Sequence, residues 1–337
     1  MAQARSVATW AAGSTAALAA ALAAGIAYSA AAVDHDLPLP PAMDADRRTF
    51  HSLEAGELSY YADERGTGRP LALIHSVNAA ASAYEMRPLF ERSRGVRPVY
   101  ALDLPGFGFS ERGDRRYTPA LYARAIADFL EQIGADRTDG ADVVALSLGG
   151  EFVARAAHER PALVHSLALI SPTGFGARQG RDRTRRGADS ASYRLLAFPL
   201  WSQAFYDLLT SRASIRAFLT LCFAGHPDAG LVDYDYATAH RPGARFAPLR
   251  FVSGELFTPD VREAIYGRLT QPVLVLYDVD PFVRFDALDD FVRRHENWRA
   301  MRVAGTKGLP QFERPLETAR ALDAFWQRAP APAAVEE

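Results

Sequence analysis

The stretch Val143-Val144-Ala145-Leu146-Ser147-Leu148-Gly149-Gly150 decides how the rest of the chain is interpreted. It is an apolar run that stops on a serine and continues through two glycines into an amphipathic segment, residues 151–160. This pattern predicts a buried strand that turns sharply into a helix and raises the Ser147 hydroxyl above the edge of a sheet. Small residues two places before and after the serine, Ala145 and Gly149, are typical of a nucleophile elbow, G-x-S-x-G. The alternative is a turn serine that caps a helix.

Composition limits the classes of protein that fit. The chain has 337 residues, of which 49% are hydrophobic and 11% aromatic, enough for one large core with an inserted subdomain. Its net charge of −2 gives no indication of a nucleic-acid partner. The single cysteine, Cys222, excludes an internal disulfide framework and a zinc site built from cysteines, and we expect it to be a core residue. Composition does not specify an oligomeric state.

The N-terminal segment differs from the rest. Residues 6–33 carry no charge and are dominated by alanine, and the segment is longer than the ~20 residues needed to cross a bilayer. A membrane anchor, a cleaved signal peptide and an alanine-rich helix lying on the domain are the three interpretations. Arg5 before the segment and Asp34 after it favour a domain outside the cytoplasm. We therefore expect membrane association through residues 6–33, or secretion.

Short apolar segments alternate with helical ones along most of the remaining chain, which predicts an α/β class with a mostly parallel sheet and helices on both faces. Residues 174–268 interrupt this alternation and are too long for a loop, so we expect an inserted helical cap. The predicted organisation is an anchor or signal peptide (1–33), a linker (34–49), the first part of the core (50–173), the cap (174–268), the second part of the core (269–328) and a disordered tail (329–337).

Four motifs occur in an order that resembles the α/β-hydrolase superfamily, from about Tyr60 to Trp326. His75-Ser76 resembles the H-G strand end, residues 103–110 resemble the loop D-x-P-G-x-G-x-S, residues 145–149 resemble the elbow, and Asp280-Pro281-Phe282-Val283 resembles the turn D-P-x-V. The resemblance implies the α/β-hydrolase fold and a small-molecule acyl or apolar substrate. It implies neither a metal nor an organic cofactor.

The resemblance also assigns roles to residues. Ser147 is the expected nucleophile, and Asp280 is the expected acid, with Asp278 as the alternative. The backbone N–H groups of Val77 and Leu148 are expected to form the oxyanion hole.

The histidine that such a site requires is missing from its usual place. The family segment G-H-x-P-x-x-E-x-P is matched by residues 307–315, where Gly308 stands at the histidine position. Gln311, two residues before the glutamate, is the alternative position, and its amide is then expected within reach of Ser147 or Asp280. Neither Gly308 nor Gln311 can accept a proton at neutral pH.

The other histidines offer few replacements for the missing base. None of the eight lies after the last predicted strand. We expect His75 to support the oxyanion loop, and only His226 and His240 of the cap remain as candidates to reach the cleft.

Two functions follow from this pattern. The first is a serine hydrolase that acts on a carboxylic ester through Ser147, and the second is a degenerate hydrolase that binds a ligand or partner without turnover. A lyase-like or peroxidase-like member would need the same missing base. A run of five arginines, Arg178, Arg181, Arg183, Arg185 and Arg186, is either a solvated loop or a contact for anionic head groups.

Overall fold

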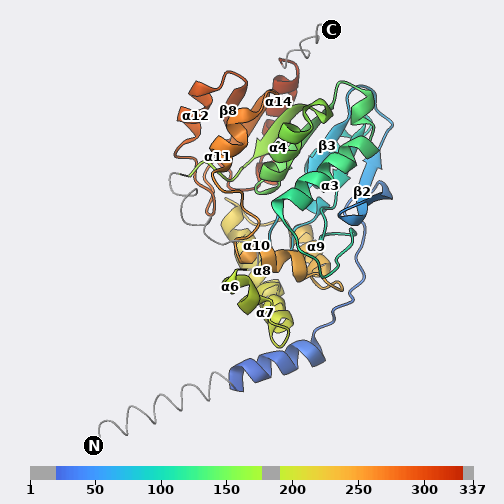
Figure 1. Cartoon of the computed structure of the whole chain (residues 1–337), viewed down its shortest axis with the longest axis vertical. Coiled ribbons are helices and arrows are strands. Elements are labelled where there is room, and N and C mark those ends of the chain that lie inside the picture. The colour runs from blue at the N-terminus through green and yellow to red at the C-terminus, as the bar shows by residue number, and fades with distance from the viewer. Residues whose placement is uncertain (1–19, 177–189, 329–337) are drawn as a thin grey trace, which may run out of the picture.

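A computed structural model describes residues 20–176 and 190–328. The arginine run, the predicted tail and the first part of the N-terminal segment lie outside these residues. Eight strands form one sheet in the order β1-β2-β4-β3-β5-β6-β7-β8, antiparallel at the first two pairings and parallel from β4 onward (Figure 1). The strands are β1 (Asp46–Ser52), β2 (Gly56–Asp63), β3 (Leu71–Ile74), β4 (Val99–Leu102), β5 (Ala141–Leu146), β6 (Val164–Ile170), β7 (Val273–Tyr277) and β8 (Trp298–Arg302).

Helices cover both faces of this sheet. Residues of β5 alternate between the two faces: Val143 and Ala145 pack into one core, and Val144 and Leu146 into the other. The first core includes α3 (Pro119–Gln132), α4 (Gly149–Glu159) and α12 (Leu288–Arg294), and the second includes α2 (Arg87–Ser93) and α14 (Pro315–Trp326). Short helical turns are η1 (Ala83–Met86), η2 (Ala135–Arg137), η3 (Pro161–Leu163) and α13 (Pro310–Glu313). The predicted fold class is confirmed.

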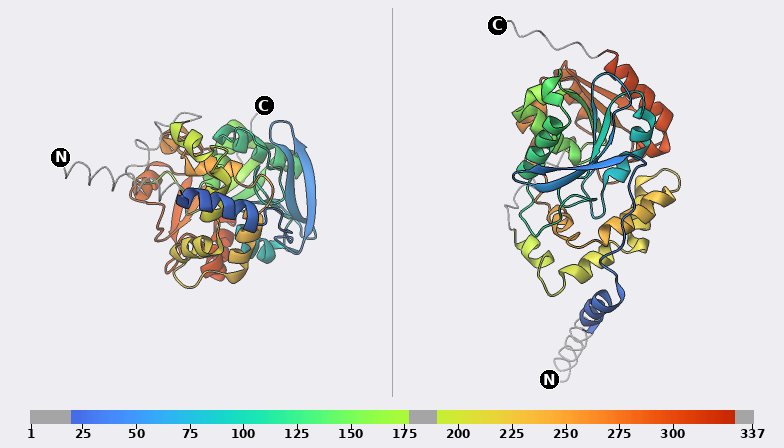
Figure 2. Two further views of the ribbon diagram at one scale, coloured as in Figure 1. Left: turned by 90° about the horizontal axis from the view of Figure 1, so that it is seen from below. Right: turned by 90° about the vertical axis from the view of Figure 1, so that its right-hand side faces the viewer.

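The long connection between β6 and β7 is helical where the structure describes it. Its segments are α6 (Ala191–Leu196), α7 (Ser202–Leu209), α8 (Arg212–Cys222), α9 (Ala229–Ala239), α10 (Phe246–Val252), α11 (Val261–Ala264) and η4 (Tyr266–Arg268). Helices α6 to α10 gather beyond one end of the sheet, as Figures 1 and 2 show. We call residues 190–268 the cap. The predicted linker is shorter than expected, because β1 begins at Asp46 and pairs there with Ala62 of β2.

Residues 20–32 form a helix that projects below the cap (Figures 1 and 2). Most of its residues are exposed, but Ser29 is buried and its hydroxyl donates a hydrogen bond of 2.5 Å to Asp207 of α7. Among helices within 20–176 and 190–328, none is long and apolar enough to cross a membrane.

The turn from β5 into α4 depends on a close crossing with the end of β3. Ser147 has a φ of 50°, a left-handed conformation that is unusual for a residue with a side chain. Its N–H donates to the carbonyl of Ile170 on β6 at 2.8 Å. A Cβ atom on Gly149 would lie 2.3 Å from the carbonyl oxygen of His75. Only glycine therefore allows α4 to start this close to the residue that follows β3.

This crossing can be tested with a matched pair of glycines. We expect Gly149→Ala to lower the free energy of unfolding by about 2 kcal/mol or more, because the added methyl group meets a backbone oxygen that cannot rotate away. Gly150→Ala is the control, since its Cβ would meet the flexible end of Leu169 at 3.0 Å. In urea unfolding, the free energy of unfolding of Gly150→Ala should lie within about 1 kcal/mol of wild type. Equal losses in both variants would mean that the crossing does not specifically require glycine at position 149.

Candidate active site

Ser147 opens onto a cavity of about 320 Å³ between the sheet and the cap. The volume is at the lower end of the usual ~300–1,000 Å³ for small-molecule sites. Its lining is mostly apolar and aromatic, with a few polar groups: Ser76, Val77, Asn78, Glu85, Leu146, Ser147, Leu148, Thr173, Phe218, Leu219, Cys222, Phe251, Phe257, Asp280, Phe282, Val283, Gly308 and Leu309. Within the described residues, the Ser147 hydroxyl has no hydrogen-bond partner. The strained turn therefore presents a free hydroxyl to this cavity.

Two backbone N–H groups at this cavity are available to a ligand oxygen. Leu148 directly precedes α4, and Val77 lies on the loop after β3; both line the cavity. In the described parts of the chain, neither N–H donates a hydrogen bond. The neighbouring Ser76 N–H is occupied, since it donates to Glu85 at 2.8 Å. The two donors expected from the sequence therefore line the same cavity as Ser147, and neither is paired within the described residues.

Glu85 orders the loop that carries Val77. One carboxylate oxygen accepts from the Ser76 N–H, and the other accepts from the Ser76 hydroxyl at 2.9 Å and from the Asn78 amide at 2.9 Å. Burial raises the pKa of Glu85 to about 7, although these donors lower it in part. The charged form that holds the loop is therefore lost as the pH falls below neutrality.

His75 is a supporting residue and not a base. It is fully buried, and its Nε2 accepts from the Leu104 N–H at 2.9 Å, so its Nδ1 carries the proton and donates to the Ser76 carbonyl. Burial lowers its pKa to about 3, which keeps the ring neutral. The following loop is organised by Asp103, which accepts from the N–H groups of Ala83 and Phe109 at 3.0 Å each.

The two acid candidates have different surroundings. Asp280 lines the cavity, and its Oδ1 accepts from the N–H groups of Phe282 and Val283 at 2.7 and 2.8 Å. Burial raises the pKa of Asp280. Asp278 is instead engaged by Arg302 at 2.5 Å and by the Thr306 N–H at 3.0 Å. Only Asp280 has a carboxylate oxygen directed at the site.

The structure separates the two candidate positions for the missing base. Gly308 lines the cavity, and a Cβ atom on it would lie 3.0 Å from Asp280 Oδ2. Gln311 is fully buried in α13, and its amide donates to the Glu85 carbonyl at 3.1 Å. The expected contact of Gln311 with Ser147 or Asp280 is therefore wrong, because the first turn of α13 directs this side chain toward η1.

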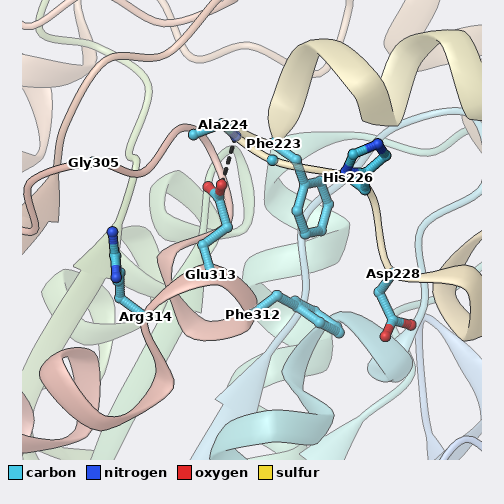
Figure 3. A pocket seen from close by; sticks show the side chains of 9 residues that line it. Phe223, Ala224, His226, Asp228, Gly305, Phe312, Glu313 and Arg314 are labelled. Carbon is cyan, nitrogen blue, oxygen red and sulfur yellow. Dashed lines mark hydrogen bonds between the residues drawn. The ribbon is translucent and has the colours of Figure 1, made fainter.

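All eight histidines fall within the described residues, and none of them lines the cavity around Ser147. His240 lies elsewhere in the cap, with its ring 4.1 Å from that of Tyr236 and its Nδ1 at the Tyr236 carbonyl. His226 lines a separate surface groove with Asp228 and Phe312 (Figure 3). The expectation that a cap histidine completes the site has no support in this arrangement.

The same groove shows how the loop before α13 is held. Glu313 accepts from the Ala224 N–H, just beyond α8, at 2.5 Å (Figure 3), and from the Lys307 N–H at 2.7 Å. The glutamate of the G-H-x-P-x-x-E pattern thus ties the loop containing Gly308 to the cap.

Cys222 lines the cavity near Gly308, and burial raises the pKa of its thiol to about 12. It is therefore a thiol at neutral pH and does not replace the base.

Two buried glutamates were not identified from the sequence. Glu85 lies three residues after Ser82, which caps η1, and Glu151 lies in the first turn of α4. Each position reads as an ordinary acidic residue near a helix start. Glu151 accepts from the Thr173 hydroxyl and from the Thr258 N–H at 2.8 Å, and burial raises its pKa to about 7. It joins the core to the cap beside the cavity.

Comparison with known proteins supports the family and the fold. Residues 71–321 match the model of the alpha/beta hydrolase family. A dihydrolipoyllysine-residue acetyltransferase component of the acetoin cleaving system from Cupriavidus necator is 34% identical over 34% of this chain and 30% of its own length. An esterase from Mycobacterium tuberculosis is 34% identical over 35% of this chain and 40% of its own length. The chain thus matches well under half of the length of these relatives.

Among solved structures, a probable hydrolytic enzyme from Pseudomonas aeruginosa PAO1 superimposes with a TM-score of 0.67 at 19% identity, over 86% of this chain and 98% of that one. Such a low identity supports the fold alone.

The buried carboxyl of Glu151 predicts a pH-dependent stability. Its pKa in the folded state, about 7, lies above the ordinary 4.5, so folding favours the neutral acid. The contribution of the neutral Glu151 carboxyl to the free energy of unfolding is complete below pH 4.5 and is lost as the pH rises to 7. Glu151→Gln should therefore gain stability relative to wild type over this range, by at most about 3 kcal/mol above pH 7.

Urea unfolding at pH 5 and pH 8 measures this difference. Glu159→Gln, at the exposed end of the same helix, is the control and should show no such gain. If Glu151→Gln and wild type lose the same amount of stability between pH 5 and pH 8, Glu151 is not the group whose ionisation destabilises the fold.

Proposed function

Because the chain belongs to the alpha/beta hydrolase family, we propose that it hydrolyses small carboxylic esters or similar acyl compounds through Ser147. The observation that carries the proposal is the free Ser147 hydroxyl, which shares one cavity with two unpaired N–H donors, those of Val77 and Leu148. These are the groups that acyl transfer requires for attack and for stabilising the oxyanion. The mostly apolar lining suits an uncharged acyl chain. The esterase among the relatives supports the same substrate class.

The absence of an imidazole from the cavity lining makes this activity slow. Sites that lack the base retain ~10³–10⁴-fold catalysis over water through binding and the oxyanion hole. Without a general base, only activated acyl compounds are expected to react at a useful rate. The Ser147 oxygen bonds to the acyl carbon while its proton passes to solvent water, and the N–H groups of Val77 and Leu148 bind the developing oxyanion. The bond from the acyl carbon to the leaving oxygen then breaks, that oxygen takes a proton from water, and a second water hydrolyses the acyl-serine.

The second candidate function is ligand binding without turnover. It is favoured by one observation, the glycine at position 308, which leaves Asp280 with no imidazole to orient. The two functions differ in whether Ser147 reacts.

A fluorophosphonate probe and a Gly308→His variant test the proposal together. We expect slow labelling of wild type that Ser147→Ala abolishes. We expect Gly308→His to accelerate labelling at least tenfold, because its ring would stand beside Asp280 and take the serine proton. This variant needs the Asp280 side chain to shift slightly, since the new Cβ would start 3.0 Å from Oδ2. Its rate should rise with pH through about 6.5 as the imidazole loses its proton.

Gln311→His is the matched control, and no acceleration is expected because residue 311 contacts the Glu85 carbonyl instead of the cavity. Glu85 itself has a pKa of about 7, so the wild-type pH profile must be subtracted before the new titration is assigned. Folded wild type and Gly308→His that both fail to label would favour the binding function. If wild type instead labels fast, with a rate that depends on pH in the same way in Glu85→Gln, another group acts as the base.

We also propose that residues 6–33 bring the protein to a membrane, with the domain outside the cytoplasm. Support comes from the helix at residues 20–32, which is mostly exposed beside α7, where Asp207 also accepts from His35 at 2.9 Å. Large apolar side chains are exposed on the nearby part of the cap: Leu195, Phe198, Leu200 and Leu208. A surface of this kind suits contact with lipid.

Membrane fractionation tests this placement. The full-length chain should sediment with membranes, whereas a chain beginning at Asp34 should stay in the supernatant, because it lacks the uncharged segment. Uncleaved full-length protein in the cytosolic fraction would refute both the anchor and the signal peptide.

A further inference from the structure

The space above Gly308 is a distinct part of the cavity. A Cβ atom on Gly308 would lie 3.0 Å from Asp280 Oδ2 and 4.0 Å from the Cβ of Cys222, and no side chain stands on this position. Ser147 and Asp280 line the same cavity. The space therefore adjoins the Asp280 carboxylate and belongs to the same cavity as the Ser147 hydroxyl.

The charges around this space are unbalanced. Asp280 Oδ1 is held by two N–H groups, whereas Oδ2 has no hydrogen-bond partner within the described residues. Glu85 adds a second carboxyl group to the lining. Among the described residues that line the cavity, none is a lysine, arginine or histidine. Oδ2 is thus free to accept a hydrogen bond from a ligand, and a ligand that supplies an N–H suits it.

Two aromatic rings suit a flat ligand. Phe218 of α8 and Phe282, two residues after Asp280, stack with ring centroids 4.9 Å apart and both line the cavity. Because the two rings stack on each other, they offer a ligand their edges and outer faces, and contact with these buries apolar area of a planar ring.

We propose that this space binds a small nitrogen heterocycle of the imidazole type, with one ring N–H donating to Asp280 Oδ2 and the other nitrogen facing the Ser147 hydroxyl. The catalytic part of this inference rests on the proposed function, whereas the binding part does not. The heterocycle is either free in solution or carried by the acyl substrate. A permanent cation would satisfy Asp280 but has no lone pair to accept a proton.

The bound ring completes a balanced acyl transfer. The Ser147 oxygen forms a bond to the acyl carbon while its proton moves to the free ring nitrogen, and the oxyanion is held by Val77 and Leu148. The bond from the acyl carbon to the leaving oxygen then breaks, and the ring returns the proton to that oxygen. Asp280 stabilises the ring while it carries the positive charge.

Binding is measured on Ser147→Ala protein by calorimetry with two methylimidazoles at about pH 9, where both rings are neutral. 4-Methylimidazole retains an N–H for Asp280, whereas 1-methylimidazole does not. We expect the first to bind at least about tenfold more tightly. Asp280→Asn should remove this preference, and Asp278→Asn, whose carboxylate faces Arg302, should retain it. No saturable binding of 4-methylimidazole, or equal binding of both rings, overturns the proposed site.

The proton-accepting role is measured by fluorophosphonate labelling of wild type. 4-Methylimidazole should accelerate labelling at least about tenfold and to saturation, and 1-methylimidazole should do so much less. Binding without acceleration of a protein that does label overturns this role. If Ser147 labels under none of these conditions, nor in Gly308→His, the hydrolase proposal fails while the binding site is judged by calorimetry alone.

The source of the ring is resolved with two esters, phenyl 3-(imidazol-4-yl)propionate and phenyl 3-phenylpropionate, after subtraction of the Ser147→Ala rate. Faster turnover of the imidazolyl ester assigns the ring to the substrate. Turnover of the phenyl isostere that needs added 4-methylimidazole assigns it to a free ligand. Equal rates for both esters, with no effect of added azole, overturn the role of the ring.

Discussion

The crossing of α4 over the end of β3 is the constraint on which the site depends. Gly149 brings the helix start against the His75 carbonyl, at a place where any side chain would collide with backbone. This contact sets the distance between the two loops that supply the N–H groups of Leu148 and Val77. The left-handed turn at Ser147, with a φ of 50°, lies two residues before this crossing. Burial of His75 as a neutral ring keeps the neighbouring loop in register.

The sequence predicted the fold and part of the site because these features depend on local patterns. Buried strands read as short apolar runs, and the elbow reads as a serine between small residues. The choice between Gly308 and Gln311 was not decidable from spacing, because the two positions are only three residues apart, Gly308 in the loop before α13 and Gln311 within that helix. Glu85 was missed because its role arises from burial against a loop nine residues earlier, which leaves no pattern in the sequence.

Under the proposed function, the cavity supplies backbone donors and a carboxylate, and no imidazole of the described residues lines it. Asp280 keeps its two N–H donors, and the oxyanion loop keeps its carboxylate support. These groups stabilise the fold around the cavity whether or not a proton is transferred. We therefore expect a substitution at Gly308 to change the reactivity of Ser147 more than the stability of the fold.

The hydrogen bonds of Glu313 have a mechanical consequence. By accepting from Ala224 and Lys307, this carboxylate joins the end of α8 to the loop that forms the cavity floor at Gly308. A displacement of α8 away from the sheet must either break these bonds or pull the floor with it. Ligand exchange that requires α8 to move is therefore limited by the lifetime of these two hydrogen bonds.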